Sequence, residues 1–286
     1  MRWERGRRSS NVEDRRAGGM RAGLVGGGGL VTLVLVLVAF YFGVDPSLLL
    51  QEMPAGSETS VSADVPTGSP EAPDTMRDFV SVVLADTEDT WQALFAEQNH
   101  RYQEPSLVLF SGQVSSACGM ASAAVGPFYC PGDSKVYIDL AFFADLRNRF
   151  DAPGDFAEAY VIAHEVGHHV QNLLGTSAKV QRARAGHGET GANALSVRLE
   201  LQADCYAGIW AYHADRSRQL LEAGDIEEGL AAASAIGDDR LQMQSRGYVS
   251  PDSFTHGSAE QRVRWFRKGY ANGQPDSCDT FSATVL

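Results

Sequence analysis

The spacing of hydrophobic and polar positions divides the chain into three regions. Residues 22–43 carry almost no polar side chains, whereas residues 44–74 are rich in Pro, Gly, Ser, Thr and acidic residues and lack a periodic apolar pattern after Met53. From Thr75 onward, apolar residues recur at the spacings typical of helices and strands. The pattern therefore predicts an apolar segment, a flexible linker and one folded domain over residues 75–286.

Apolar spacing within the predicted domain indicates a few strands followed by a mostly helical half. A first helix with a wide apolar face begins at Thr75 and ends before Pro105. Three short strands follow it, over residues 106–110, 121–129 and 135–140. Helical spacing then returns over residues 155–175, 193–216, 225–236, from Asp238, and over 258–270. This order predicts the α+β class, and Val136–Asp139 is the candidate edge strand for a bound peptide.

The most specific motif is His164-Glu165-Val166-Gly167-His168, which lies inside the predicted helix 155–175. Histidines four residues apart project from one helical face, so both imidazoles can reach one ion. Glu165 is then placed to take a proton from a water molecule that the ion activates. The motif predicts zinc-assisted hydrolysis, and the alternative is two histidines on the polar face of an ordinary helix. His169 points about 100° away from His168, so we expect it at the surface or behind the ligands.

A third ligand is predicted on the helix over residues 193–216, because a catalytic zinc ion usually has three protein ligands. Glu200 and Asp204 lie four residues apart on that helix. We expect Glu200 to complete the ligand set and Asp204 to accept the second N–H of a ligating histidine. Without the histidine motif, a solvated acidic face would be the simpler interpretation.

The same motifs carry a resemblance to a known family. H-E-x-x-H followed by E-x-x-x-D on a later helix resembles the gluzincin metallopeptidases, and the chain as a whole is similar to the neutral zinc metallopeptidase family of bacteria. The segments that carry this similarity are residues 1–3, 10–16, 136–140, 164–175, 199–208 and 256–262. The resemblance implies a zincin-like fold with a small sheet and a mostly helical half, and one Zn²⁺ per chain bound by His164, His168 and Glu200.

His256 is the remaining catalytic candidate. It precedes a predicted helix whose start is marked by a capping box, Ser258 with Gln261. By resemblance to gluzincins, a downstream histidine at this place donates to the oxyanion of the tetrahedral intermediate. The alternative is a loop histidine without a role. Arg262, one turn into that helix, is expected to hold the loop or Asp204 in place.

The N-terminal region predicts a membrane anchor. Residues 1–21 contain seven arginines and three acidic residues, a net charge of +4. Residues 22–43 are long enough to cross a bilayer once, and Phe40-Tyr41-Phe42 suit an interfacial aromatic belt. The positive charge predicts a cytoplasmic segment 1–21, a transmembrane helix 22–43 and a catalytic domain outside, in the periplasm or at the cell surface. A cleaved signal peptide is the alternative.

Charge and cysteines refine this prediction. The 17 basic and 33 acidic residues after residue 21 give a net charge of −16, which argues against a nucleic-acid partner. Four cysteines in an oxidising compartment favour two disulfides over free thiols or a Cys-rich zinc site. Of the three possible connectivities, we favour one in which the second bridge ties the C-terminal tail to the ligand helix: Cys118–Cys130 and Cys205–Cys278.

These features together predict a membrane-anchored extracytoplasmic zinc endopeptidase with Glu165 as general base. Its partners would be a peptide or protein substrate and the membrane, and the sequence sets no oligomeric state. Two alternatives remain open. One is a zinc-stabilised envelope scaffold or adaptor without catalysis, and the other is a metal-dependent hydrolase of cell-wall peptides.

Overall fold

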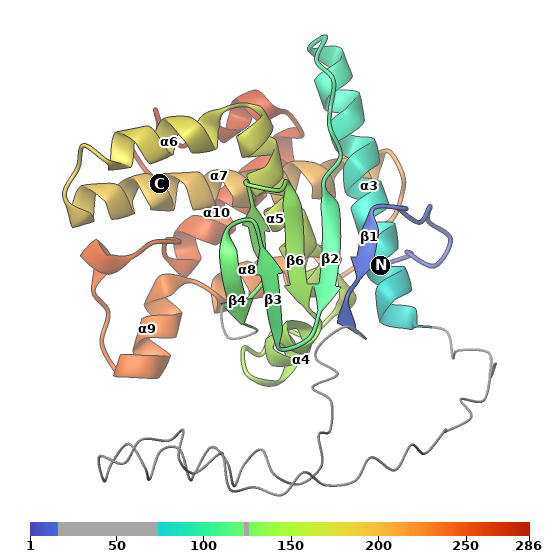
Figure 1. The fold of residues 1–286 in the computed structure, drawn as a ribbon, viewed down its shortest axis with the longest axis horizontal. Coiled ribbons are helices and arrows are strands. Elements are labelled where there is room, and N and C mark those ends of the chain that lie inside the picture. The colour runs from blue at the N-terminus through green and yellow to red at the C-terminus, as the bar shows by residue number, and fades with distance from the viewer. Residues whose placement is uncertain (17–73, 123–125) are drawn as a thin grey trace, which may run out of the picture. The chain divides into compact units, whose positions relative to one another are not determined.

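A four-stranded sheet in the order β1-β2-β6-β5 lies beside a larger set of helices (Figure 1). The computed structural model describes residues 1–16, 74–122 and 126–286. Strands β1, β2 and β6 are parallel, and β5 pairs with β6 in antiparallel fashion. The sheet strands are β1 (Val12–Asp14), β2 (Ser106–Phe110), β5 (Phe128–Cys130) and β6 (Lys135–Asp139). A separate hairpin is formed by β3 (Gln113–Ser116) and β4 (Gly119–Ser122).

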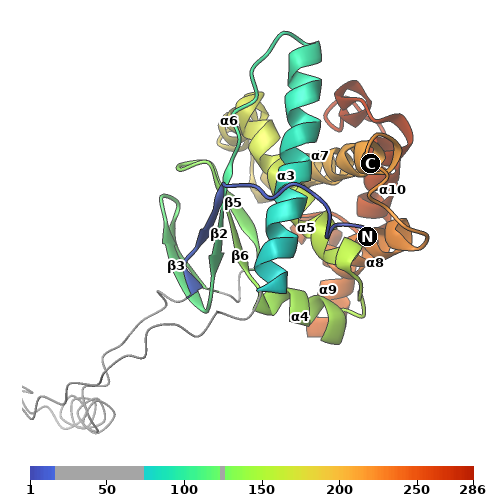
Figure 2. The same cartoon turned by 90° about the vertical axis from the view of Figure 1, so that its right-hand side faces the viewer.

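The helices make up most of the folded region, as the turned view in Figure 2 shows. They are α3 (Thr75–Glu97), α4 (Ala141–Asn148), α5 (Asp155–Leu173), α6 (Thr176–Arg184), α7 (Glu189–Arg216), α8 (Asp225–Ala235), α9 (Asp238–Arg246) and α10 (Ala259–Asn272). Short 3-10 helices cover Pro251–Ser253 and Pro275–Cys278. The predicted α+β class is therefore confirmed, with a small sheet and a mostly helical half.

Helix α5 lies at the centre of the packing, where it contacts α3, α7, α8 and strands β5 and β6. Most of its apolar side chains, including Phe156, Tyr160 and Val166, are fully buried. The helix ends where Gly175 adopts a left-handed conformation, with φ of 74°, which lets α6 begin in a new direction. Burial on nearly all sides fixes the orientation of the polar residues that α5 carries.

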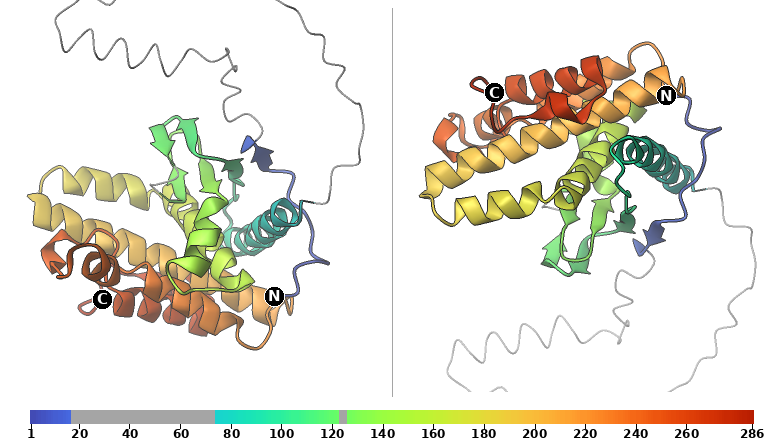
Figure 3. Two further views of the ribbon diagram at one scale, coloured as in Figure 1. Left: turned by 90° about the horizontal axis from the view of Figure 1, so that it is seen from below. Right: turned by 90° about the horizontal axis from the view of Figure 1, so that it is seen from above.

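Close backbone approaches bring α7 against both α5 and α10. A Cβ at Gly167 would lie 3.0 Å from the carbonyl oxygen of Ala203, so α5 and α7 meet without a side chain between them at this point. Helices α7 and α10 run side by side (Figure 3). A Cβ at Gly208 would lie 2.1 Å from the carbonyl oxygen of Phe266, and one at Gly269 would lie 1.9 Å from that of Cys205.

Residues 1–16, the N-terminal strap, belong to the same compact unit as residues 74–286. The strap runs across α3 and adds β1 to the sheet beside β2 (Figure 2). Its Met1 side chain is buried, and the α-ammonium lies 2.9 Å from Asp155 Oδ2. The predicted separation of residues 1–21 from the domain is therefore wrong for residues 1–16. Arginines ahead of an apolar stretch indicate membrane orientation and carry no signal of a packing partner.

The predicted transmembrane helix, residues 22–43, lies outside the described residues, as does the predicted linker apart from Asp74. Within the ranges that the structure describes, no helix combines the length and the apolarity needed to cross a bilayer. The membrane anchor stays a prediction.

Several details of the predicted elements differ in the structure. The predicted strand 121–129 is divided between β4 of the hairpin and β5 of the four-stranded sheet, and α4 lies where no element was predicted. Strand β6, which contains Val136–Asp139, is an interior strand between β2 and β5, so the edge next to it is β5. The prediction was wrong because Pro131-Gly132-Asp133-Ser134 folds β5 back onto β6 and covers its outer side. The connection after Gly175, predicted as a loop to residue 192, contains α6.

Both predicted disulfides are present. Cys118 pairs with Cys130, which joins the β3–β4 turn to the end of β5. Cys205 in the middle of α7 pairs with Cys278, so the C-terminal tail is tied to that helix. All four cysteines are thereby used, as an extracytoplasmic location would favour.

Candidate metal centre

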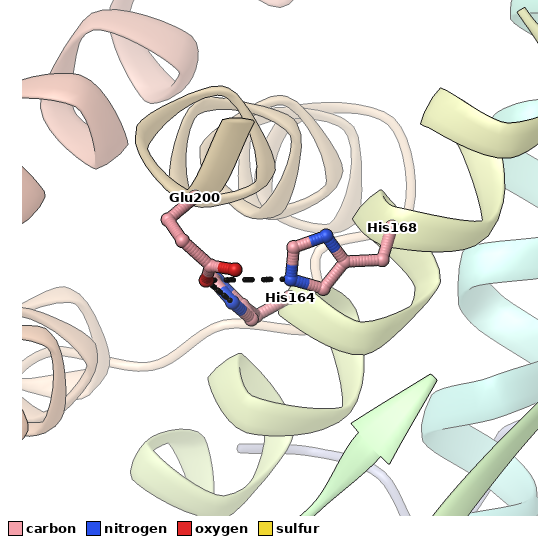
Figure 4. A group of neighbouring side chains, drawn as sticks. All are labelled: His164, His168 and Glu200. Atoms are coloured by element: carbon pink, nitrogen blue, oxygen red, sulfur yellow. Dashed lines mark hydrogen bonds and ion pairs between the residues drawn. The ribbon is translucent and has the colours of Figure 1, made fainter. Parts of the chain in front are cut away.

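Helices α5 and α7 bring His164, His168 and Glu200 together (Figure 4). The two histidines lie one turn apart on α5, and Glu200 faces them from α7. Glu200 Oε2 lies 3.2 Å from His164 Nε2 and 3.4 Å from His168 Nε2. One ligand atom from each residue lies within 4.8 Å of the other two. The contact of Gly167 with α7 explains this approach, because it lies between the two histidines.

The separations of the donor atoms fit a zinc ion. Zinc bonds to imidazole nitrogen and carboxylate oxygen are about 2.1 Å long, and a tetrahedral arrangement then separates two donors by about 3.4 Å. The observed separations of 3.2 and 3.4 Å between Glu200 Oε2 and the imidazoles match this value. Two nitrogens and one carboxylate oxygen leave a fourth position for water or substrate, which is typical of catalytic zinc sites.

A buried polar network lies behind His164. Its Nδ1 lies 2.8 Å from Asp204 Oδ1, and with Nδ1 as the donor of a neutral ring, Nε2 would offer its lone pair to a metal ion. Arg262 of α10 donates to both carboxylate oxygens of Asp204 at 2.9 Å. The Tyr160 hydroxyl also donates to Asp204 and accepts from Arg262 at 3.1 Å. The structure thus places Asp204 where the sequence predicts it, and it places Arg262 on Asp204.

Charges within this network shift its pKa values strongly. Burial by itself lowers the pKa of His164, but the carboxylates of Asp204 and Glu200 outweigh it and raise the pKa to about 10. Burial raises the pKa of Asp204, and the charges of Arg262 and His164 overcome this and lower it to about 2. Asp204 is therefore a permanent anion at physiological pH, which holds the imidazole of His164 in one orientation.

Gln171 performs the equivalent task for His168, a role that was not predicted from the sequence. The His168 Nδ1 atom lies 2.9 Å from Gln171 Oε1, which directs Nε2 toward Glu200. Gln171 is fully buried and donates to the carbonyl oxygen of Leu199 at 2.6 Å, one residue before the ligand on α7. Its spacing of three residues from His168 was the available signal, since such residues are neighbours on a helix.

His169 is fully buried, which excludes the surface, one of the two places where the sequence pattern allowed it. Its Nε2 lies 2.6 Å from the carbonyl oxygen of Gln103, and its Nδ1 lies 3.1 Å from the Tyr129 hydroxyl. Burial lowers the pKa of His169, which keeps the ring neutral. The residue therefore attaches α5 to β5 and to the segment before β2, away from the metal position.

A cavity of about 640 Å³ opens onto the three ligands. Glu165 and His256 both line it, so every predicted catalytic and ligating residue faces one space. Its wall also contains aromatic side chains from β5 and from the α4 region: Phe128, Tyr129, Phe142 and Phe150. A cavity with converging polar groups and an apolar wall is typical of a site for an extended organic substrate.

His256 is held in this cavity by Asp238, the first residue of α9. Asp238 Oδ2 accepts the backbone N–H groups of Thr255, His256 and Gly257 at distances between 2.7 and 3.0 Å. Its Oδ1 lies 3.3 Å from His256 Nδ1, and this interaction raises the pKa of His256. The imidazole is half exposed, so its other nitrogen is accessible from the cavity.

Comparisons with known proteins agree with this arrangement. The family described as "Putative neutral zinc metallopeptidase" matches residues 1–281. The protein named "Uncharacterized protein YpfJ" of Escherichia coli K12 is 48% identical over 293 residues and covers 100% of both chains. "Uncharacterized protein Mb2605" of Mycobacterium bovis is 44% identical over 258 residues, which are 87% of this chain and 86% of that protein. No solved structure gives a significant match.

Proposed function

Because this chain belongs to the neutral zinc metallopeptidase family, we propose that it is a zinc-dependent endopeptidase with a zincin-like catalytic domain. The observation that carries the proposal is the convergence of His164, His168 and Glu200 at separations that fit tetrahedral zinc. Glu165 and His256 line the cavity in front of these ligands, where a peptide could be held.

A zinc ion held by His164, His168 and Glu200 would polarise the scissile carbonyl and acidify a water molecule. Glu165 takes the proton of that water and returns it to the leaving amine. Its position next to His164 on α5, with 7% of its surface exposed, keeps the carboxylate at the cavity wall. His256 donates to the developing oxyanion, and Asp238 orients it.

The proposed location is extracytoplasmic. Two disulfides use all four cysteines, and such bridges persist in oxidising compartments. The apolar sequence of residues 22–43 supports association with a membrane. The substrate would then be a peptide or protein of the envelope or the surroundings.

The decisive experiment compares the wild-type full-length protein with Glu165→Gln. We expect one zinc per chain in both proteins and cleavage of a mixed peptide library by the wild type alone. Glu260→Gln, an exposed change on α10, serves as the matched control and should behave as wild type. Cleavage by the Glu165→Gln protein at the wild-type rate would contradict the assignment.

Zinc binding without any cleavage in the wild type would favour a zinc-stabilised scaffold instead. Cleavage confined to cell-wall peptides would favour a metal-dependent hydrolase of cell-wall peptides that uses the same site.

A further inference from the structure

The N-terminal strap fills a specific place in the folded domain. Glu88 of α3 is a carboxylate whose side chain is 1% exposed. Among the described residues, the side-chain hydrogen bonds to it all come from the strap: Arg7, Ser9 and Asn11. A buried carboxylate is costly unless such partners are present. Helix α3 is therefore built to receive the strap.

Apolar and backbone contacts extend this docking over the whole strap. Trp3 packs edge-on against Phe79 of α3, with ring centroids 5.4 Å apart. Gly6 lies so close to α3 that a Cβ there would be 2.4 Å from Val82 Cγ1. Further along, β1 pairs in register with β2, and the carbonyl oxygen of Asn11 accepts from the Leu107 N–H at 2.8 Å.

Two arginines of the strap form ion pairs with the start and the middle of the α3 segment. Arg7 forms ion pairs with Glu88 at 2.9 Å and with Asp89 at 2.7 Å. Arg16, at the end of the strap, pairs with Asp14 and with Asp74, the residue just before α3. The residue at which the chain leaves the domain, Arg16, therefore lies beside the residue at which it returns, Asp74.

We infer that the strap and residues 74–286 lie on the same side of the membrane in the folded protein. A single crossing by residues 22–43 would place them on opposite sides, where none of these contacts could form. Exchange between copies does not remove the conflict, because every copy would have the same orientation. A return crossing would need a second apolar stretch of about 20 residues, and residues 44–73 contain none.

This inference revises the cytoplasmic N-terminus that the arginine count predicts. The positive-inside rule counts charges that remain free near the membrane surface, whereas Arg7 and Arg16 are ion-paired in the domain. It is independent of catalysis, so its test needs no activity measurement.

The test is a cysteine pair, Gly6→Cys with Val82→Cys, in the full-length protein. The Cβ atoms at these positions are 3.6 Å apart, within the range of a disulfide. A specific protease site is inserted into residues 44–73, and intact membranes are oxidised with copper phenanthroline, which passes through bilayers. After cleavage, the N-terminal fragment should remain attached to the domain until a reductant is added. Gly6→Cys with Ser245→Cys, on exposed α9, is the mismatched control and should not cross-link.

Fragments that separate in membranes but cross-link after detergent solubilisation would overturn the inference, because the strap would then be kept apart by the bilayer. Separation under both conditions would overturn the docking itself. As a second measurement, the exposed single variants Ser10→Cys and Ser245→Cys are treated with an impermeant maleimide in whole cells. Both should be labelled or both protected, and labelling of only one would also overturn the inference.

Discussion

Replacing Asp204 by Asn tests whether the buried network behind His164 supports both the fold and the metal site. The substitution keeps the shape of the side chain and removes its charge. A carboxylate offers two acceptor oxygens, whereas an amide offers one oxygen and an NH₂ donor. In the structure, Asp204 Oδ1 accepts from His164 and Oδ2 accepts from Arg262. In the Asp204→Asn protein an amide oxygen at the Oδ1 position can still accept from His164, but the NH₂ group then faces the Arg262 Nε–H, which loses its acceptor.

The structure sets the expected loss of stability. Arg262 has 3% of its side chain exposed, so water cannot replace the lost counter-ion. Breaking a buried pair in this way costs about 3–5 kcal/mol. The pKa of about 2 for Asp204, against an ordinary 3.8, corresponds independently to about 2 kcal/mol. This contribution is present above pH 3.8 and is lost as the pH falls toward 2. We expect the free energy of unfolding to fall by about 3 kcal/mol at neutral pH.

The zinc affinity should fall as well, by about 10–100-fold, because a neutral amide holds the His164 imidazole less firmly than the carboxylate does. Urea unfolding of the metal-free protein measures the first effect, and competition with a zinc chelator measures the second. Asp215→Asn is the matched control, since Asp215 lies on the same helix and accepts from the Tyr270 hydroxyl at 2.8 Å, outside the network. A zinc affinity unchanged in Asp204→Asn would refute the reasoning.

Three further results are expected. Gly167→Ala should weaken zinc binding by about tenfold, measured by chelator competition, because the added Cβ forces α5 and α7 apart; unaltered affinity would contradict this. Burial raises the pKa of Glu158 to about 7, so ionisation of this side chain destabilises the wild-type fold as the pH rises. The free energy of unfolding of Glu158→Gln, measured in urea, should therefore gain up to about 3 kcal/mol on that of the wild type between pH 5 and 8, and a difference that does not change with pH would count against this. Asp238→Asn should lower the pKa of His256, so the alkaline limit of peptidase activity should move to lower pH while the zinc content stays constant. If that limit does not move, His256 takes no part in the proposed reaction.

The sequence was sufficient to predict the site because its signals are local. Residues four apart on a helix must share a face, so the histidines on α5 and the acids on α7 each point one way. Their meeting also required only that two long amphipathic helices pack together. Arg262 was expected to hold either the loop or Asp204, and it holds Asp204. The two disulfides are the connectivity that was favoured among three possible ones.

The remaining features depend on contacts between distant segments, for which the sequence carries no periodic signal. The docking of the strap depends on Glu88. In the sequence alone, Glu88 is indistinguishable from an acidic residue on the exposed face of a helix. The edge position of β5 depends on how a three-residue strand pairs, and short strands have weak patterns. Gln171 was overlooked because its role is visible only when its contacts with His168 and the Leu199 carbonyl are known.

The backbone contact between α7 and α10 affects how mutational data on this protein should be interpreted. Gly208 lies one turn beyond Asp204 on α7, and Phe266, whose carbonyl it meets, lies one turn beyond Arg262 on α10. A contact made of backbone atoms has no rotamers with which to absorb an added methyl group. Replacement of Gly208 by Ala would therefore shift the guanidinium away from the carboxylate without changing any ligand. In an unbiased screen for lost zinc, this glycine would score like a metal-binding residue.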